Sequence, residues 1–328
     1  MKAFSNVNPR DLHEAVTLLN QAHQQGRSAS LVGGGSDLLG MVKEHLVQPD
    51  VLVHLRGING LDRIEAKGGK VNIGGQTTLD TVSRDQLIRK SYTVLAEAAE
   101  DVATPQIRNV GTLAGNVCQR PWCWYFRNGF RCLKNGGNTC FSANGENQFH
   151  AIFGGGPSYI VHPSDTAPAL VALDAQFHVT GPSGDRTINS SDFFQLPRVD
   201  ATRENVLGKD DVLASITLSG ARPNQRSAYH KVLDREAWTH AVVSAAIVLD
   251  MDKQVCRNAR VVLGGVAPIP WRLPKVEAML TGQRITPELA AKAGEAAVEG
   301  ARPLAKNKYK IPLTKGVVRR TLLSLAQA

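Results

Sequence analysis

Hydrophobic positions in the first hundred residues repeat at helical spacing and then gather in short runs. Apolar side chains over residues 12–22 recur every three or four positions and predict a helix, with Asn8 as its N-cap, Pro9 at its first position and Gly26 after its end. Short runs bounded by Gly or Asp predict strands. We expect strands at residues 29–32 and 51–55 and two more within 58–75, and helices at residues 38–45, 78–89 and 92–101.

The middle of the chain loses this periodicity. Residues 104–157 are rich in Gly and Asn and predict a long loop, which in a compact domain indicates a functional segment. After it we expect a strand from Tyr159, a helix after Asp165, a hairpin over residues 175–187 and a strand at 211–218. Residues 221–224 are typical of a boundary between domains. Beyond it we expect strands around residues 227, 243 and 261, and helices from residues 273 and 286 and in the last fifteen residues.

Composition excludes several classes of protein. The chain has 328 residues, of which 42% are hydrophobic and 20% charged, so it can bury a core and is neither disordered nor fibrous. The net charge is +9, but the longest Lys/Arg run is Arg319–Arg320, which favours a solvated basic surface over nucleic-acid binding. No apolar stretch approaches the roughly 18 residues of a membrane span, and the first residues lack the apolar core of a signal peptide. We expect a soluble cytoplasmic protein, or one exported to the periplasm with a signal-bearing partner subunit.

Four of the five cysteines lie within 23 residues, in the spacing C-x4-C-x8-C-x7-C. They are Cys118, Cys123, Cys132 and Cys140. A disulfide framework would spread its cysteines along a small secreted chain, so this loop indicates a metal or cluster site. Zinc sites usually pair their ligands as C-x2-4-C, a pattern that is absent here, and the wide spacing favours an iron–sulfur cluster over zinc. Five aromatic residues interleave with the cysteines and would shield a cluster from water.

Two small-residue loops are candidates for a phosphate or cofactor site. Residues 31–39 (LVGGGSDLL) enter a glycine turn from a strand, which lets backbone N–H groups approach phosphate oxygens. The turn is neither G-x-G-x-x-G nor a P-loop. Residues 108–116 (RNVGTLAGN) place Thr and Asn side chains between two further turns. Taken alone, the first loop is equally compatible with an ordinary turn, whereas the composition of the second favours an ordinary loop whose side chains bond the backbone.

The order of these motifs resembles a known family. Residues 32–38, 108–116 and 163–170 (PSDTAPAL) resemble the FAD-binding subunit of the xanthine dehydrogenase and aldehyde oxidoreductase family of molybdenum hydroxylases, and residues 261–268 (VVLGGVAP) resemble the C-terminal domain of these flavoproteins. The resemblance implies an α+β fold with a two-lobed PCMH-type FAD-binding domain at residues 1–221 and a smaller α+β flavoprotein domain at 222–328. It implies an iron–sulfur insertion at about residues 117–151.

The resemblance also assigns site residues. FAD would contact Val32, Gly33, Gly34, Gly35, Ser36, Asp37, Leu38, Leu39, Val102, Thr112, Gly115, Asn116, Asp165, Leu213 and Lys231. The alternative for Lys231 is a surface charge. The cysteine loop is similar to that of periplasmic aldehyde oxidoreductase and 4-hydroxybenzoyl-CoA reductase, which carry an additional 4Fe–4S cluster. Cys123, Cys132 and Cys140 match those relatives, with Cys118 favoured as the fourth ligand and His150 as its alternative.

The implied function is electron transfer as one subunit of an oxidoreductase. Molybdenum cofactor and 2Fe–2S clusters are expected on a large and a small partner subunit, in a heterotrimer or a dimer of heterotrimers. Electrons would pass from these partners through FAD and the 4Fe–4S cluster to an external acceptor. Two alternatives remain open: the flavin subunit of an aryl-CoA reductase, and a non-redox nucleotide-binding module with a zinc-stabilised loop.

Overall fold

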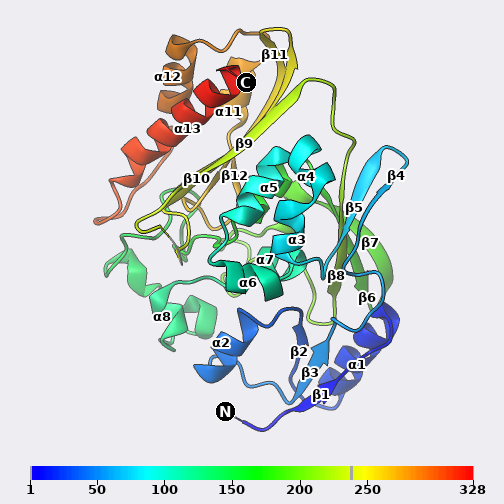
Figure 1. Ribbon diagram of the computed structural model, residues 1–328. Coiled ribbons are helices and arrows are strands. Elements are labelled where there is room, and N and C mark those ends of the chain that lie inside the picture. The colour runs from blue at the N-terminus through cyan, green and yellow to red at the C-terminus, as the bar shows by residue number, and fades with distance from the viewer. Residues whose placement is uncertain (1, 237–238, 328) are drawn as a thin grey trace.

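The computed structural model describes residues 2–236 and 239–327, which form three β-sheets with helices packed between and around them (Figure 1). The N-terminal sheet is parallel, in the order β1 (Ser5–Val7), β3 (Val51–His54), β2 (Ala29–Val32), and α1 (Leu12–Gln24) covers it. Asp11 caps α1, because its side chain accepts from the Glu14 N–H, so the predicted start at Asn8 and Pro9 was wrong. Gly26 follows the helix with a φ of 72°, as expected for a helix end.

The second sheet is antiparallel and carries the larger core. Its order is β4 (Ile64–Lys67), β5 (Lys70–Gly74), β8 (Val212–Leu218), β6 (Gln176–Gly181), β7 (Gly184–Asn189). Three helical elements pack over it: α3 (Leu79–Arg84), α5 (Thr93–Glu100) and α9 (Thr166–Ala172). α4 (Gln86–Ser91) and α10 (Ser190–Phe193) complete this region. The predicted helix at 78–89 is split at Asp85, whose side chain accepts from the Ile88 N–H and starts α4.

The C-terminal sheet lies between two sets of helices. Its order is β12 (Trp271–Arg272), β11 (Val255–Gly264), β10 (Val243–Asp252), β9 (Gln225–Val232). On β10, Ala246 and Val248 join the core with α5 and α9, whereas Ala245 and Ile247 face α11 (Pro274–Leu280), α12 (Pro287–Ala296) and α13 (Lys310–Gln327). Alternate side chains of a strand point to opposite faces, so this strand is apolar throughout because both faces are covered. Figure 1 shows α13 and α5 on the two sides of this sheet.

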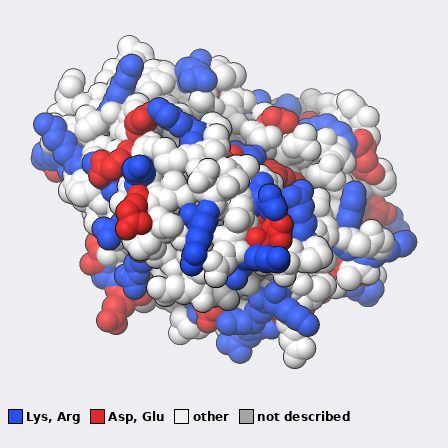
Figure 2. Space-filling view, turned by 90° about the horizontal axis from the view of Figure 1, so that it is seen from above, with Lys and Arg blue, Asp and Glu red and all other residues white. Residues whose placement is uncertain are grey.

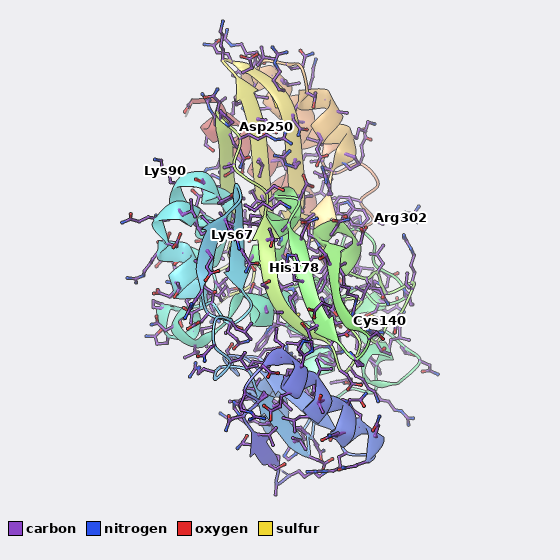
Figure 3. The ribbon with its side chains drawn as sticks, turned by 90° about the vertical axis from the view of Figure 1, so that its right-hand side faces the viewer. Lys67, Lys90, Cys140, His178, Asp250 and Arg302 are labelled. Carbon is purple, nitrogen blue, oxygen red and sulfur yellow. The ribbon has the colours of Figure 1, made fainter. Side chains whose placement is uncertain are left out.

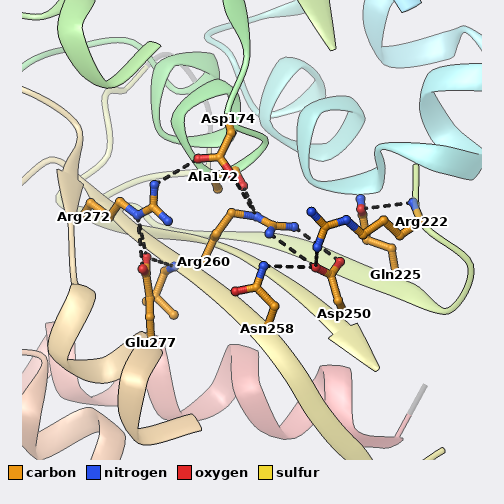
Figure 4. Close-up of polar contacts among 10 residues, drawn as sticks. Ala172, Asp174, Arg222, Gln225, Asp250, Asn258, Arg260, Arg272 and Glu277 are labelled. Atoms are coloured by element: carbon orange, nitrogen blue, oxygen red, sulfur yellow. Dashed lines mark hydrogen bonds and ion pairs between the residues drawn. The ribbon is translucent and has the colours of Figure 1, made fainter. Parts of the chain in front are cut away.

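A buried cation joins the C-terminal sheet to α9 (Figure 4). Arg260 is 6% exposed, and its guanidinium donates to the Ala172 carbonyl at 2.9 Å and to Asp250 at 3.3 Å. Arg272 donates to Asp174 at 2.9 Å and to Glu277 at 2.9 Å. These contacts satisfy charges that would otherwise be costly to bury, and they fix α9 against the third sheet.

The segment predicted as a long loop contains short helices. α6 (Pro105–Val110), α7 (Leu113–Val117) and α8 (Trp124–Arg127) lie within it, and two 3-10 turns follow at Leu133–Asn135 and Phe141–Ala143. Each is too short for apolar periodicity to show. The strand predicted from Tyr159 is absent among the described residues, where this stretch is irregular. The α+β organisation with a separate C-terminal sheet is confirmed.

Charged side chains are dispersed over the surface seen in Figure 2, where Lys and Arg alternate with Asp and Glu among uncharged residues. Within the described ranges, no helix is both long and apolar enough to cross a membrane.

Candidate functional site

Three sequence motifs that are far apart in the chain line one cavity of about 570 Å³. They are the glycine loop between β2 and α2 (Leu38–Lys43), the turn that begins α7, and the segment that precedes α9. The cavity is within the size range of cofactor sites. The fold thus brings together three loops that no local sequence pattern connects.

The glycine loop packs directly against the end of α6. A Cβ on Gly34 would stand 1.8 Å from the Val110 carbonyl oxygen, and one on Gly33 would stand 2.8 Å from the Thr112 hydroxyl. Only glycine allows this approach of two backbones. The backbone N–H groups of Gly34, Gly35 and Ser36 donate to no acceptor among the described residues. Successive unpaired N–H groups form a concavity that suits an anion.

The second loop is held by its own side chains. Thr112 caps α7 by accepting from the Gly115 N–H at 3.2 Å. Asn116, on the same short helix, accepts from the hydroxyls of Ser164 at 2.6 Å and Thr166 at 2.7 Å. This amide therefore joins the second loop to the start of α9, and the side chains of Asn116, Ser164 and Thr166 are buried.

A buried ion pair forms one wall of the cavity. Asp165 accepts from the Lys231 ammonium and from the Tyr229 hydroxyl, each at 2.7 Å, and Lys231 also donates to the Asp101 carbonyl at 2.8 Å. The Lys231 side chain is 1% exposed, so it is not the surface charge that the alternative interpretation described. Burial and the Asp165 carboxylate raise the pKa of Tyr229 well above its ordinary value, which keeps this hydroxyl a donor.

The remaining predicted residues divide between the cavity and its surroundings. Gly33, Gly34, Gly35, Ser36, Asp37, Leu38, Val102, Thr112, Gly115, Asn116, Asp165 and Leu213 line it. Val32 packs into the interior beneath the loop, and Leu39 is 42% exposed. Lys231 reaches the cavity only through Asp165. Other lining residues were not predicted, among them Trp122, Arg235 and His240.

Three of the four clustered cysteines line a second, much smaller cavity. Cys123, Cys132 and Cys140 surround it together with Ser142, Ser158 and the buried Lys134, and among the described residues no carboxylate lines it. The cavity measures about 10 Å³, so a metal cluster would require the loop to widen. Among the described residues, no three Cys, His, Asp or Glu side chains converge closely enough to hold a single metal ion. Figure 3 shows Cys140 at the edge of the molecule opposite Lys90.

Cys118 lies apart from the other three cysteines. It lines the large cavity and packs against the main core, and burial raises the pKa of its thiol to about 12. His150, the alternative fourth ligand, lies with the other group: its Nε2 is 3.3 Å from the Cys123 Sγ. The structure thus brings together three cysteines and His150 and leaves Cys118 beside the glycine loop.

Ion pairs attach the cysteine loop to the walls of the large cavity. Asp37 accepts from the Arg127 guanidinium at 2.7 Å and from the Arg120 N–H at 2.9 Å. Glu204 pairs with the Arg120 guanidinium at 2.8 Å and with Lys134, whose side chain is 1% exposed, at 2.6 Å. Trp122 and Cys123 are adjacent in sequence and line different cavities, so the two candidate sites are neighbours.

Comparison with known proteins now defines the family. Residues 2–218 match the model of the FAD binding domain in molybdopterin dehydrogenase, and residues 228–325 match the CO dehydrogenase flavoprotein C-terminal domain. The chain belongs to the FAD-binding family of molybdopterin dehydrogenases. It is therefore an oxidoreductase subunit with an FAD-binding domain, and the predicted two-domain flavoprotein fold is confirmed.

Individual relatives agree along the full length. The chain is 33% identical to the FAD-binding subunit PaoB of aldehyde oxidoreductase from Escherichia coli, over 100% of this chain and 99% of the relative. It is 28% identical to the carbon monoxide dehydrogenase medium chain of Hydrogenophaga pseudoflava, over 96% and 94%. The solved carbon monoxide dehydrogenase from Hydrogenophaga pseudoflava superposes with a TM-score of 0.77 at 26% identity and covers 99% of this chain and 97% of the other.

Two groups that sequence reasoning missed had different signals. Tyr229 precedes Lys231 by two positions on β9, and strand periodicity places both on one face, so the pair was accessible from sequence. Ser158 carried no signal, because a lone serine in a glycine-rich stretch is usually a turn residue.

Proposed function

We propose that this chain is the electron-transferring FAD subunit of a molybdenum-containing hydroxylase of the aldehyde or xanthine oxidoreductase type. The observation that carries the proposal is the large cavity lined jointly by the glycine loop, the α7 turn and the Asp165 segment. The matched relatives are named as a FAD-binding subunit and a medium chain, which supports partner chains that hold the molybdenum cofactor and 2Fe–2S clusters. Substrate oxidation would then occur on the large partner, and this chain would pass electrons to an external acceptor.

FAD, when bound, supplies the exchange of one or two electrons. The N–H groups of Gly34, Gly35 and Ser36 would hold its pyrophosphate, since no described residue accepts a hydrogen bond from them. Thr112 and Asn116 would position the second loop against it. Asp165 holds its orientation through Tyr229 and Lys231, and this fixed carboxylate would accept from a polar edge of the cofactor.

The cysteine cavity fits an iron–sulfur cluster by the chemistry of its donors. Three thiols and two hydroxyls line one space, no carboxylate of the described residues lines it, and thiolates are the ordinary ligands of such clusters. Tyr125, Phe130 and Phe141 stack beside it with ring centroids 5.3 to 5.9 Å apart, which would limit access of water. We include a 4Fe–4S cluster on Cys123, Cys132 and Cys140 in the proposal.

The test is to purify the chain with the products of its neighbouring genes and to record absorption, metal content and flavin content. We expect one FAD per chain, visible flavin and iron–sulfur bands, and reduction of both when an aldehyde or a purine is added. A colourless protein that holds zinc in place of iron and no flavin would refute the redox function. Bands that no aldehyde or purine bleaches would refute the assignment to a hydroxylase of this type.

FAD is expected to be noncovalent. Cys118 lines the cavity, but its high thiol pKa keeps it protonated and a poor nucleophile. The histidine at the cavity, His240, already has a partner, since its Nδ1 lies 3.3 Å from the Pro163 carbonyl oxygen. Acid precipitation should release the yellow colour into solution. Colour that stays in the pellet would contradict this prediction.

A further inference from the structure

The small cavity provides two oxygen donors beside its three thiols, and they differ in their contacts. Ser142 Oγ lies 3.1 Å from Cys140 Sγ and is already engaged with sulfur. Ser158 is 2% exposed, lines the same cavity, and its hydroxyl makes no hydrogen bond to any described residue. The Tyr159 N–H donates to Cys140 Sγ at 3.5 Å, which holds residue 158 beside that cysteine. Ser158 is therefore the uncommitted polar side chain at this cavity.

The imidazole of His150 is arranged as a donor to sulfur. Its Nε2 lies 3.3 Å from Cys123 Sγ, whereas its Nδ1 is buried and has no partner among the described residues. If Nε2 bound iron, Nδ1 would carry the ring proton and become a buried N–H without an acceptor. Ligating histidines normally donate that second N–H to a fixed acceptor, and no described residue offers His150 one. The proton therefore belongs on Nε2, where it is donated to Cys123.

The backbone around His150 is fixed from the C-terminal domain, so a rearrangement of the ring is opposed. Asn307 donates to the His150 carbonyl at 3.0 Å, and the buried Lys310 ammonium donates to the Phe149 carbonyl at 2.9 Å. Lys310 also donates to the Gly265 carbonyl at 2.6 Å. These contacts hold the backbone of residues 149 and 150 against the C-terminal domain.

We propose that Ser158 is the fourth protein ligand of the cluster, through its oxygen, and that His150 is a positioning residue that donates a hydrogen bond to the Cys123 thiolate. This inference rests on the iron–sulfur cluster of the proposed function. On binding, an iron–oxygen bond forms and the hydroxyl proton leaves to water, with no change of oxidation state. An oxygen donor is harder than thiolate, so the iron at Ser158 is expected to be the most readily lost of the four.

The test compares five forms of the full chain, each reconstituted anaerobically with iron and sulfide: wild type, Ser158→Ala, Ser158→Cys, Ser142→Ala and His150→Ala. Iron and sulfide per chain, the EPR spectrum of the oxidised state and the midpoint potential are measured. Ser142→Ala is the matched control, because it also removes a serine hydroxyl from this cavity. Ser158→Ala should lower iron from about four to about three per chain and give the EPR signal of a three-iron cluster.

The other variants should separate ligation from hydrogen bonding. Ser158→Cys and Ser142→Ala should keep four irons, and Ser158→Cys should lose iron to a chelator more slowly than wild type. His150→Ala should keep four irons with a lowered midpoint potential, because a hydrogen bond to a ligand sulfur is removed. Four irons in Ser158→Ala, or loss of iron in His150→Ala, would overturn the assignment while leaving the cluster in place. A wild-type chain that takes up no iron would instead refute the cluster of the proposed function, and this ligand with it.

Discussion

Replacing Gly34 with alanine tests whether the glycine loop holds FAD as proposed. The added methyl carbon would stand 1.8 Å from the Val110 carbonyl oxygen, whereas real Cβ contacts are almost never shorter than 3.0 Å. The glycine loop and the end of α6 must therefore separate by about 1.2 Å. A displacement of that size takes the N–H donors of the loop out of hydrogen-bonding range of a phosphate. The primary effect of the methyl group is thus on loop packing, and FAD binding weakens as its consequence.

The expected loss of affinity follows from the donors displaced. Hydrogen bonds to a charged group contribute about 1.5–3 kcal/mol, so losing one lowers FAD affinity about 10- to 150-fold. The assay is calorimetric titration of the flavin-free full chain with FAD. Gly40→Ala is the matched control, because Gly40 lies in α2, two residues after its start, and a Cβ there meets no atom within 4 Å. Wild-type affinity in Gly34→Ala, or an equal loss in Gly40→Ala, would refute the reasoning.

Four further changes test the charges and hydrogen bonds around the two cavities. Lys231→Met leaves the buried Asp165 carboxylate without its cation and should lower the free energy of unfolding in urea by about 3–5 kcal/mol. The double variant Lys231→Met/Asp165→Asn should recover much of this loss. A double variant as unstable as Lys231→Met would contradict the pairing. Tyr229→Phe removes one hydrogen-bond donor to Asp165 and should lower the free energy of unfolding by about 1–3 kcal/mol in the same assay. An unchanged free energy of unfolding would contradict this prediction. Burial lowers the pKa of Lys310 from its ordinary value of 10.5 to about 7, so between these pH values the unfolded chain binds more protons than the folded chain and the free energy of unfolding should rise with pH. Lys310→Met should flatten that rise in urea titrations at successive pH values. Parallel wild-type and variant curves would refute the role of Lys310 in this pH dependence. Arg127→Met removes the ion pair with Asp37 and should expose the cysteine loop to limited proteolysis faster than Arg131→Met, an exposed arginine of the same loop.

Local requirements of the backbone made much of this protein predictable. Apolar spacing located α1, β5, β8 and the three C-terminal helices, because a helix or strand repeats its buried positions at a fixed period. The three candidate cofactor motifs and the group of cysteines could be recognised in the sequence, because clustered glycines indicate tight turns and clustered cysteines indicate a metal or cluster site. The short helices α6, α7 and α8 were missed, since four to six residues are too few to show a period.

Tertiary structure decided which of those residues act together. Sequence proximity placed Cys118 with the other cysteines, but α7 directs it to the large cavity. Ser158, 18 positions after Cys140, lines the cysteine cavity instead, and His150, 27 positions after Cys123, approaches that thiol. Asp165 and Lys231 are 66 residues apart and meet because the C-terminal sheet, which contains β9, packs against α9. Sequence by itself determined the elements and the chemical groups available, because both depend on neighbouring residues. The pairing of those groups depends on how the three sheets pack. The packing energy is distributed over many contacts between residues far apart in the chain, and no local sequence pattern records them.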